Sequence, residues 1–118
     1  MKKIFQLDTC NTCQRILKEW DAPASFSIQN IKAENIDAPS LDFAAGKLGS
    51  YEALFSRRAI KFKTLGLANK KLTEKDYRKL ILEEYTFLKR PVMINEGQVF
   101  AGNAKATVDA AKLSLKRK

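Results

Sequence analysis

The first thirty residues combine two short apolar runs with one amphipathic stretch. Residues 2–7 form a short apolar run, which predicts a buried strand. In residues 11–20 the apolar positions recur at helical spacing, which predicts a helix. Phe26 and Ile28 then alternate with polar residues, which predicts a second strand with one buried face. The order is therefore βαβ.

The middle of the chain, residues 39–85, has a helical pattern throughout. Ser50 can cap one helix, and the sequence Thr73-x-x-Asp76 is a capping box that opens the clearest helix. That helix is expected to bury one face, made of Tyr77, Leu80, Ile81, Tyr85 and Leu88. The predicted helical segments cover residues 40–48, 51–58, 60–65 and the stretch from 74 onward.

The C-terminal part returns to strands before a last helix. Residues 91–94 and 98–101 flank Asn95-Glu96-Gly97, which predicts a hairpin. A helix is expected from Asn103 or Ala104, with Val108, Ala111 and Leu115 at helical spacing. The full order is βαβ, helices, ββα, without an internal repeat or a linker. We therefore expect one α/β domain over residues 1–118.

Composition places the chain among globular proteins. Its 118 residues are 45% apolar, and no apolar run approaches the ~20 residues of a membrane span. Residues 4–7 are too short for the core of a signal peptide. We expect a cytoplasmic protein, in a reducing compartment where a cysteine pair is more often catalytic or metal-binding than structural.

The net charge of +9 favours anionic partners, such as oxyanions, glutathione, acidic protein faces or nucleic acid. Much of the excess lies on predicted helices and in residues 112–118, where it is typical of a solvated face. No aromatic and basic platform and no DNA-binding motif occurs. Direct nucleic-acid binding is therefore not expected.

Cys10 and Cys13 are the only cysteines, and they lie between the first predicted strand and the first predicted helix. Asn11 or Thr9 is the expected cap of that helix. Free N–H groups and the positive end of the helix dipole stabilise a thiolate on the first sulfur, and the second sulfur is near enough to close a disulfide. A C-x-x-C in a βα context is typical of a thioredoxin-like redox motif.

Three other interpretations of the pair compete with a redox motif. A zinc site needs two more soft ligands, and the chain has no histidine and no third cysteine. A structural disulfide over so short a loop constrains the unfolded chain little. The third alternative is two buried thiols that are close by coincidence, and it stays open.

The chain resembles the ArsC/Spx family of thioredoxin-fold proteins over essentially its whole length. The landmarks are Thr9-Cys10-Asn11-Thr12-Cys13-Gln14-Arg15, Leu54-Phe55-Ser56-Arg57-Arg58, Phe62, Leu65-Gly66-Leu67, Lys89-Arg90-Pro91-Val92 and Gly102-Asn103. The resemblance implies an α/β, thioredoxin-like mixed sheet of about four strands with a helical insertion between its halves.

The resemblance also implies roles for particular residues. In the arsenate reductases of this family a cysteine attacks arsenate and arginines hold the oxyanion; Cys10 and Arg90 match these. Pro91 is expected to follow a cis bond and to face the redox cysteine. Cys13 matches the second cysteine of Spx-type proteins and would resolve a mixed disulfide. Further substrate-binding candidates are Arg57 and Arg58, beside a family arginine position, and Asn11 and Thr12 in the motif.

One family arginine is missing from this chain. The position after the final strand carries Gly102-Asn103, an ending that is similar to the Spx and YffB branches. We therefore expect weak or absent arsenate reduction, and we expect Gly102→Arg to raise it.

The expected function is arsenate reductase-like thiol–disulfide redox catalysis by a monomer, with Cys10 as nucleophile and an anionic or thiol substrate. Glutathione, glutaredoxin or thioredoxin would be the reductant, with no bound metal or organic cofactor. The alternative is a Spx-like regulator, in which the Cys10–Cys13 disulfide is a switch and the output is binding to RNA polymerase.

Overall fold

The computed structural model of the protein describes residues 1–116, which fall into two compact units. The first, called the sheet unit here, consists of residues 1–34 and the chain from Arg90 onward. The second, called the helical unit, is the inserted segment of residues 35–89. The insertion of helices between a βαβ half and a ββα half is as predicted.

The sheet unit contains a mixed sheet of four strands in the order β2-β1-β3-β4. Strand β1 runs parallel to β2 and antiparallel to β3, and β3 is antiparallel to β4. The strands are β1 Lys2–Gln6, β2 Ser27–Asn30, β3 Val92–Asn95 and β4 Gln98–Ala101. This confirms the predicted fold class.

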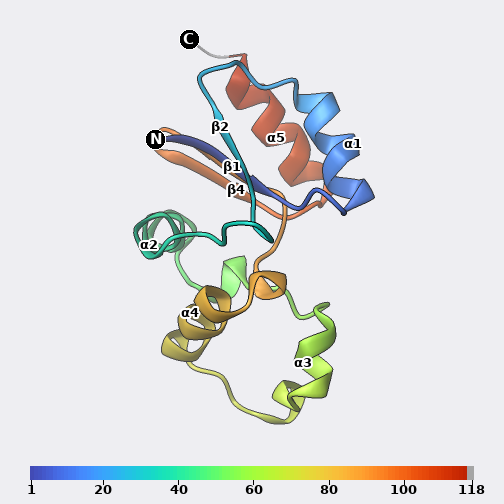
Figure 1. The fold of residues 1–118 in the computed structure, drawn as a ribbon. Helices are drawn as coiled ribbons and strands as arrows, with labels where there is room; N and C mark the ends of the chain where they lie inside the picture. Colours follow the sequence, from blue (N-terminus) through green and yellow to red (C-terminus); the bar gives the residue numbers. More distant parts are fainter. Residues whose placement is uncertain (117–118) are drawn as a thin grey trace. The chain divides into compact units, whose positions relative to one another are not determined.

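Two helices, α1 (Asn11–Trp20) and α5 (Lys105–Leu115), lie side by side along the sheet (Figure 1). The indole Nε1 of Trp20 donates to the backbone oxygen of Val108 at 3.0 Å and joins the two helices. Apolar side chains from both helices and the sheet form one buried cluster: Ile4, Ile16, Trp20, Phe26, Met93, Val108 and Ala111. This core holds the middle and end of α1, through Ile16 and Trp20, against the sheet; the two cysteines lie at the other end of the helix.

Three details of the sheet unit differ from the prediction. The alternating pattern predicts a buried Ile28, but its side chain is 53% exposed because β2 is an edge strand. Phe26 is buried, but it reaches the core from the residue before the strand. In the hairpin, Asn95 is the last residue of β3, so the turn is only Glu96-Gly97.

The helical unit has three α-helices, α2 Ala38–Leu48, α3 Ile60–Thr64 and α4 Glu74–Glu83. Short 3-10 helices occur at η1 Glu52–Leu54, η2 Leu67–Asn69 and η3 Tyr85–Phe87. The predicted capping box is present: the Thr73 side chain accepts from the Asp76 N–H, and the Asp76 carboxylate accepts from the Thr73 N–H.

The prediction of a helix over residues 51–58 is wrong. Only η1 forms there, and Phe55 is extended and makes an isolated bridge with Leu88. Phe55 is buried against the rings of Phe62, Tyr77 and Phe87, and this packing overrides the local helical pattern. The Ser50 hydroxyl accepts a hydrogen bond from the Ala53 N–H at 3.1 Å, but the N-cap residue of η1 is Tyr51.

The predicted apolar face of α4, which includes Tyr85 and Leu88, also extends beyond the end of the helix. The helix ends at Glu83 because Glu84 is extended, with φ −140° and ψ 112°. Tyr85 therefore lies in η3, and Leu88 lies in the bridge with Phe55.

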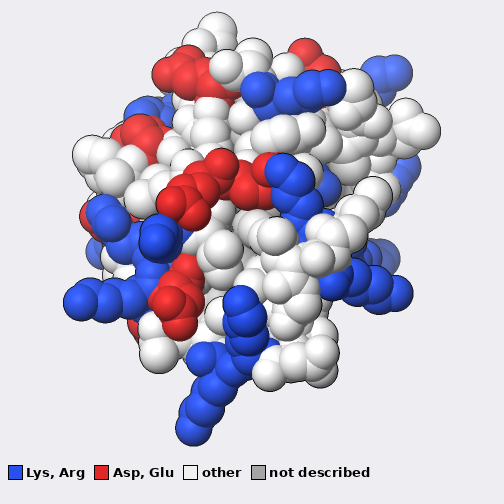
Figure 2. Space-filling view, turned by 60° about the horizontal axis from the view of Figure 1, so that its bottom comes forward, with Lys and Arg blue, Asp and Glu red and all other residues white. Residues whose placement is uncertain are grey.

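None of the helices in residues 1–116 has the length and apolar character needed to cross a bilayer. On the face shown in Figure 2, Asp and Glu side chains are interspersed among the Lys and Arg side chains. The positive charge on this face is therefore broken up rather than continuous.

Candidate functional site

Cys10 is itself the N-cap residue of α1, in place of the predicted Asn11 or Thr9. Its backbone is extended (φ −93°, ψ 110°), and its Sγ accepts a hydrogen bond from the Cys13 N–H with an N to Sγ distance of 3.4 Å. The sulfur thus occupies the place of a capping oxygen. A negative charge on this atom is stabilised by the unpaired N–H groups of the helix start.

These contacts lower the pKa of the half-buried Cys10 thiol below its usual value. Burial alone would raise it, since burial disfavours the thiolate. Hydrogen bonds from the backbone and thiol of Cys13, the charge of Arg90 and the backbone N–H of Thr12 act in the opposite direction and prevail. Cys10 is therefore a reactive thiol candidate.

Cys13 has the opposite character. Its side chain is fully buried, and burial raises the pKa of the Cys13 thiol to about 11. The hydrogen bond and negative charge of Cys10 also raise it, while the Leu7 backbone and Arg90 lower it. The pair therefore consists of one activated sulfur and one protonated sulfur.

Arg90 and Pro91 precede β3, and the bond between them is cis, which confirms the expectation from the resemblance. Arg90 is close enough for its charge to act on both cysteines. The Pro91 carbonyl accepts from the Gly102 N–H at 3.0 Å, so the turn after β4 lies beside the proline.

Gly102 has φ +98°, a left-handed conformation that other residues rarely adopt. An arginine at this position would therefore be strained, and Gly102→Arg is a poor way to restore the missing family arginine. Asn103 is exposed and has ordinary φ, so it is the better host for a new side chain.

Asn11 and Thr12 are the first two residues of α1. The Asn11 side chain is exposed, and Thr12 contributes its backbone N–H to the environment of Cys10. Their predicted contact with substrate stays a prediction.

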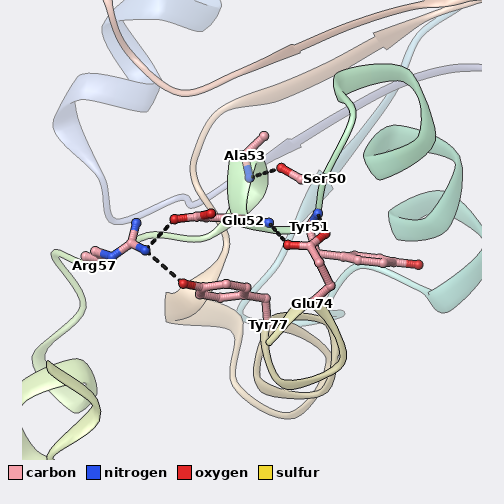
Figure 3. Close-up of polar contacts among 7 residues, drawn as sticks. All are labelled: Ser50, Tyr51, Glu52, Ala53, Arg57, Glu74 and Tyr77. Atoms are coloured by element: carbon pink, nitrogen blue, oxygen red, sulfur yellow. Dashed lines mark hydrogen bonds and ion pairs between the residues drawn. The ribbon is translucent and has the colours of Figure 1, made fainter. Parts of the chain in front are cut away.

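Arg57 and Arg58 belong to the helical unit, and both side chains are exposed. One guanidinium nitrogen of Arg57 donates to the Glu52 carboxylate at 2.7 Å and to the Tyr77 hydroxyl at 2.9 Å (Figure 3). Arg57 thus already has an anionic partner on its own unit, so binding a substrate anion would compete with that contact.

Two glutamines near the cysteines have no role predicted from the sequence. Gln6 is buried within β1, and Gln14 lies one residue after Cys13 on α1. The Gln14 side chain donates to the Gln6 side chain at 2.9 Å and to the Leu7 carbonyl at 3.1 Å. A glutamine inside an apolar strand was the available signal, because a buried amide needs partners.

Within residues 1–116, no three cysteine, histidine, aspartate or glutamate side chains are grouped so that they could hold a metal ion. The chemistry available at Cys10 is therefore that of a thiolate beside a second thiol and a guanidinium.

The ArsC family model matches residues 5–111, nearly the whole chain and every residue of this cluster. The chain belongs to the ArsC family. In this chain, the cysteine motif and Arg90-Pro91 belong to the two sequence halves of the sheet unit, which the helical insertion separates along the chain.

Solved ArsC-type structures have the same fold. The YFFB protein has a TM-score of 0.77 at 24% identity, over 98% of this chain and 99% of its own. An arsenate reductase related protein from Brucella melitensis has a TM-score of 0.66 at 23% identity, over 92% of both chains. Arsenate reductase from Vibrio cholerae has a TM-score of 0.77 at 16% identity, over 93% of this chain and 96% of its own.

No curated protein matches the chain. The solved structures, at these identities, establish the thioredoxin-like fold of the ArsC family and leave the substrate to be argued from the site.

Proposed function

We propose that this ArsC-family protein is a thiol–disulfide oxidoreductase in which Cys10 attacks the substrate and Cys13 resolves the intermediate. One observation supports this most strongly. The Cys10 sulfur caps α1 and accepts a hydrogen bond from the Cys13 N–H, and the charge of Arg90 lowers the pKa of Cys10. Cys13 itself is fully buried. A coincidental pair of buried thiols would not combine these features.

In the first step, the Cys10 thiolate attacks one sulfur of a substrate disulfide. A Cys10–substrate disulfide forms, the substrate S–S bond breaks, and the other substrate sulfur leaves as a thiolate that takes a proton from water. The lowered pKa of Cys10 makes the attacking thiolate available near neutral pH.

In the second step, Cys13 loses its proton to solvent and attacks Cys10 Sγ. The Cys10–Cys13 disulfide forms, and the substrate sulfur leaves as a thiolate. Burial keeps the pKa of Cys13 high, but Cys10 no longer carries a negative charge once the mixed disulfide exists. One cause of the raised pKa is thus removed at the stage where Cys13 must react.

The cycle closes when two electrons from glutathione, glutaredoxin or thioredoxin reduce the Cys10–Cys13 disulfide. Arg90 would hold an anionic group of the substrate, such as a carboxylate of glutathione, because a guanidinium can bind a carboxylate with two parallel hydrogen bonds. Such a cycle needs no metal and no organic cofactor, and it suits a cytoplasmic protein.

Arsenate is a poorer candidate substrate. Its reduction requires several oxygens to be held while charge moves to sulfur, and each well-placed donor is worth about a hundredfold in rate. After β4 the chain offers Gly102, whose N–H is already bonded to Pro91, and the uncharged Asn103.

The substrate class is tested by measuring turnover of arsenate and of a glutathione mixed disulfide with each reductant. We expect clear turnover of the disulfide and weak or absent turnover of arsenate, and we expect Asn103→Arg to raise the arsenate rate. Asn103→Gln is the matched control, since it adds length without charge. Robust arsenate turnover by the wild-type protein would show that another group replaces the missing arginine.

A regulatory role is the second candidate, favoured by the cysteine pair together with the Gly102-Asn103 ending. Here the Cys10–Cys13 disulfide would change the affinity for RNA polymerase instead of turning over a substrate. A polymerase pull-down with oxidised and reduced protein separates the two. Redox-dependent capture without disulfide turnover would favour the regulator.

A further inference from the structure

The loop before Cys10 is held by a chain of side-chain hydrogen bonds. Gln6 lies on β1 and is only 4% exposed; its amide nitrogen donates to the Asp8 carboxylate at 2.7 Å. Its amide oxygen accepts from Gln14 on α1 at 2.9 Å. The Asp8 N–H donates to the Asn30 side-chain oxygen at 3.2 Å. The loop is thus tied to two strands and to the helix that it joins.

The chemistry of these groups sets their orientation. An ionised Asp8 carboxylate can only accept, so Gln6 presents its amide nitrogen to Asp8 and its oxygen to Gln14. Gln14 must then present its amide nitrogen, and this nitrogen also reaches the Leu7 carbonyl at 3.1 Å. The direction of each amide follows from its partner.

The Leu7 carbonyl is where this chain of bonds reaches the reactive cysteine. It accepts both the Gln14 amide and the backbone N–H of Cys10, at 3.1 and 3.0 Å. Whatever fixes this carbonyl also fixes the backbone of Cys10, and with it the direction of Sγ toward the Cys13 N–H. Without Gln14, the carbonyl would lose one of these two bonds.

We propose that Gln14 is a positioning residue: its amide, oriented by Gln6, fixes the Leu7–Cys10 turn and so holds Cys10 Sγ in place over the Cys13 N–H. The inference rests on the proposed function in that it takes Cys10 as the nucleophile. Gln14 touches no reacting atom and acts through the backbone alone.

The expected consequence is a change in Cys10 ionisation. The titratable and charged groups that act on Cys10 are Cys13 from α1 and Arg90 from the segment before β3, and Asp8 lies in the same loop. None of these changes in Gln14→Met, which keeps the length of the side chain and removes both donated bonds. Any shift in the pH profile of Cys10 must then come from its position.

The test is the rate of iodoacetamide alkylation of Cys10 across pH, followed by mass spectrometry. We expect Gln14→Met to move the midpoint to higher pH and to slow alkylation at neutral pH about fivefold, as for one lost hydrogen bond. Gln98→Met makes the same uncharged substitution at an exposed site on β4 and should leave the profile unchanged.

A second variant separates positioning from general damage. Gln6→Met should move the midpoint in the same direction but less, since Gln14 keeps its bond to the Leu7 carbonyl. The double variant should match Gln14→Met alone, because both residues act through one chain of bonds. Circular dichroism establishes that each variant is folded, and Gln6→Met carries the test if Gln14→Met does not fold.

Two results would overturn the inference: a folded Gln14→Met with the wild-type midpoint, or a double variant whose shift is the sum of the single shifts. If only Gln6→Met folds, an unshifted midpoint has the same meaning. A wild-type Cys10 that titrates like an ordinary thiol would instead refute the proposed function itself.

Discussion

Cys10→Ser is expected to reduce thiol–disulfide turnover to the uncatalysed level, the largest effect of any single change in this protein. A serine hydroxyl keeps nearly the shape of the thiol, but it is not ionised at neutral pH and cannot form a disulfide. Turnover of a glutathione mixed disulfide with glutathione as reductant measures the loss.

Cys13→Ser is the matched variant, because it should stop the cycle halfway. Cys10 can still attack, so a stable glutathione adduct on Cys10 should accumulate and be visible by intact-mass spectrometry after treatment with glutathione disulfide. The wild-type protein should instead lose two thiols and form one intramolecular disulfide. Turnover by Cys10→Ser, or unmodified cysteines in all three proteins, would support a coincidental pair of buried thiols.

Arg90→Ala is expected to have the second largest effect, a fall in kcat/KM of about a hundredfold. Two causes act together. The substrate loses a charged hydrogen-bond donor, and the pKa of Cys10 rises because the positive charge that lowers it is gone. Less thiolate is then present at neutral pH, so part of the lost rate should return as the pH is raised.

Two further variants make the Arg90 result specific. Arg90→Lys keeps the charge but not the planar fork, so it should recover the thiolate more than it recovers substrate binding. Arg78→Ala removes an equal charge from the helical unit, where Arg78 pairs with Asp42, and should leave kcat/KM unchanged. If Arg78→Ala and Arg90→Ala lower kcat/KM equally, Arg90 acts only through the net charge of the protein and not at the site.

Signals that act over a few residues predicted the fold well. The capping box at Thr73 and Asp76 and the hairpin around Glu96-Gly97 depend on neighbours in sequence, and both are present in the structure. The helix predicted over residues 51–58 failed for the opposite reason. Phe55 is extended because it packs on Tyr77 and Phe87, more than twenty residues away, and no local pattern encodes that contact.

The candidate site was predictable to a similar extent. The motif and the resemblance located Cys10, Cys13, Arg90 and the cis bond before Pro91. They did not reveal that Cys10 itself caps the helix, since sulfur is a weaker acceptor than the side-chain oxygens of Asn11 or Thr9.

The contacts of Gln14 and Gly102 could not be predicted from the sequence, because each joins separate elements of the fold. Gln14 bonds to Gln6 across a strand-to-helix connection, and the Gly102 N–H donates to the Pro91 carbonyl, which precedes a different strand. The pairing of Arg57 with Tyr77 belongs to the same class of contacts.

Alkylation of the wild-type protein at a series of pH values, with the two cysteines followed separately by mass spectrometry, tests the central claim most directly. A lowered pKa keeps Cys10 as thiolate in the neutral range, so its rate should fall only as the pH drops through that lowered value. Cys13, with its pKa raised to about 11, should stay slow until the pH is strongly alkaline. We predict that Cys10 reacts much faster than Cys13 near neutrality. Equal rates, with both midpoints near the ~8.5 of a free thiol, would contradict the assignment of Cys10 as an activated nucleophile.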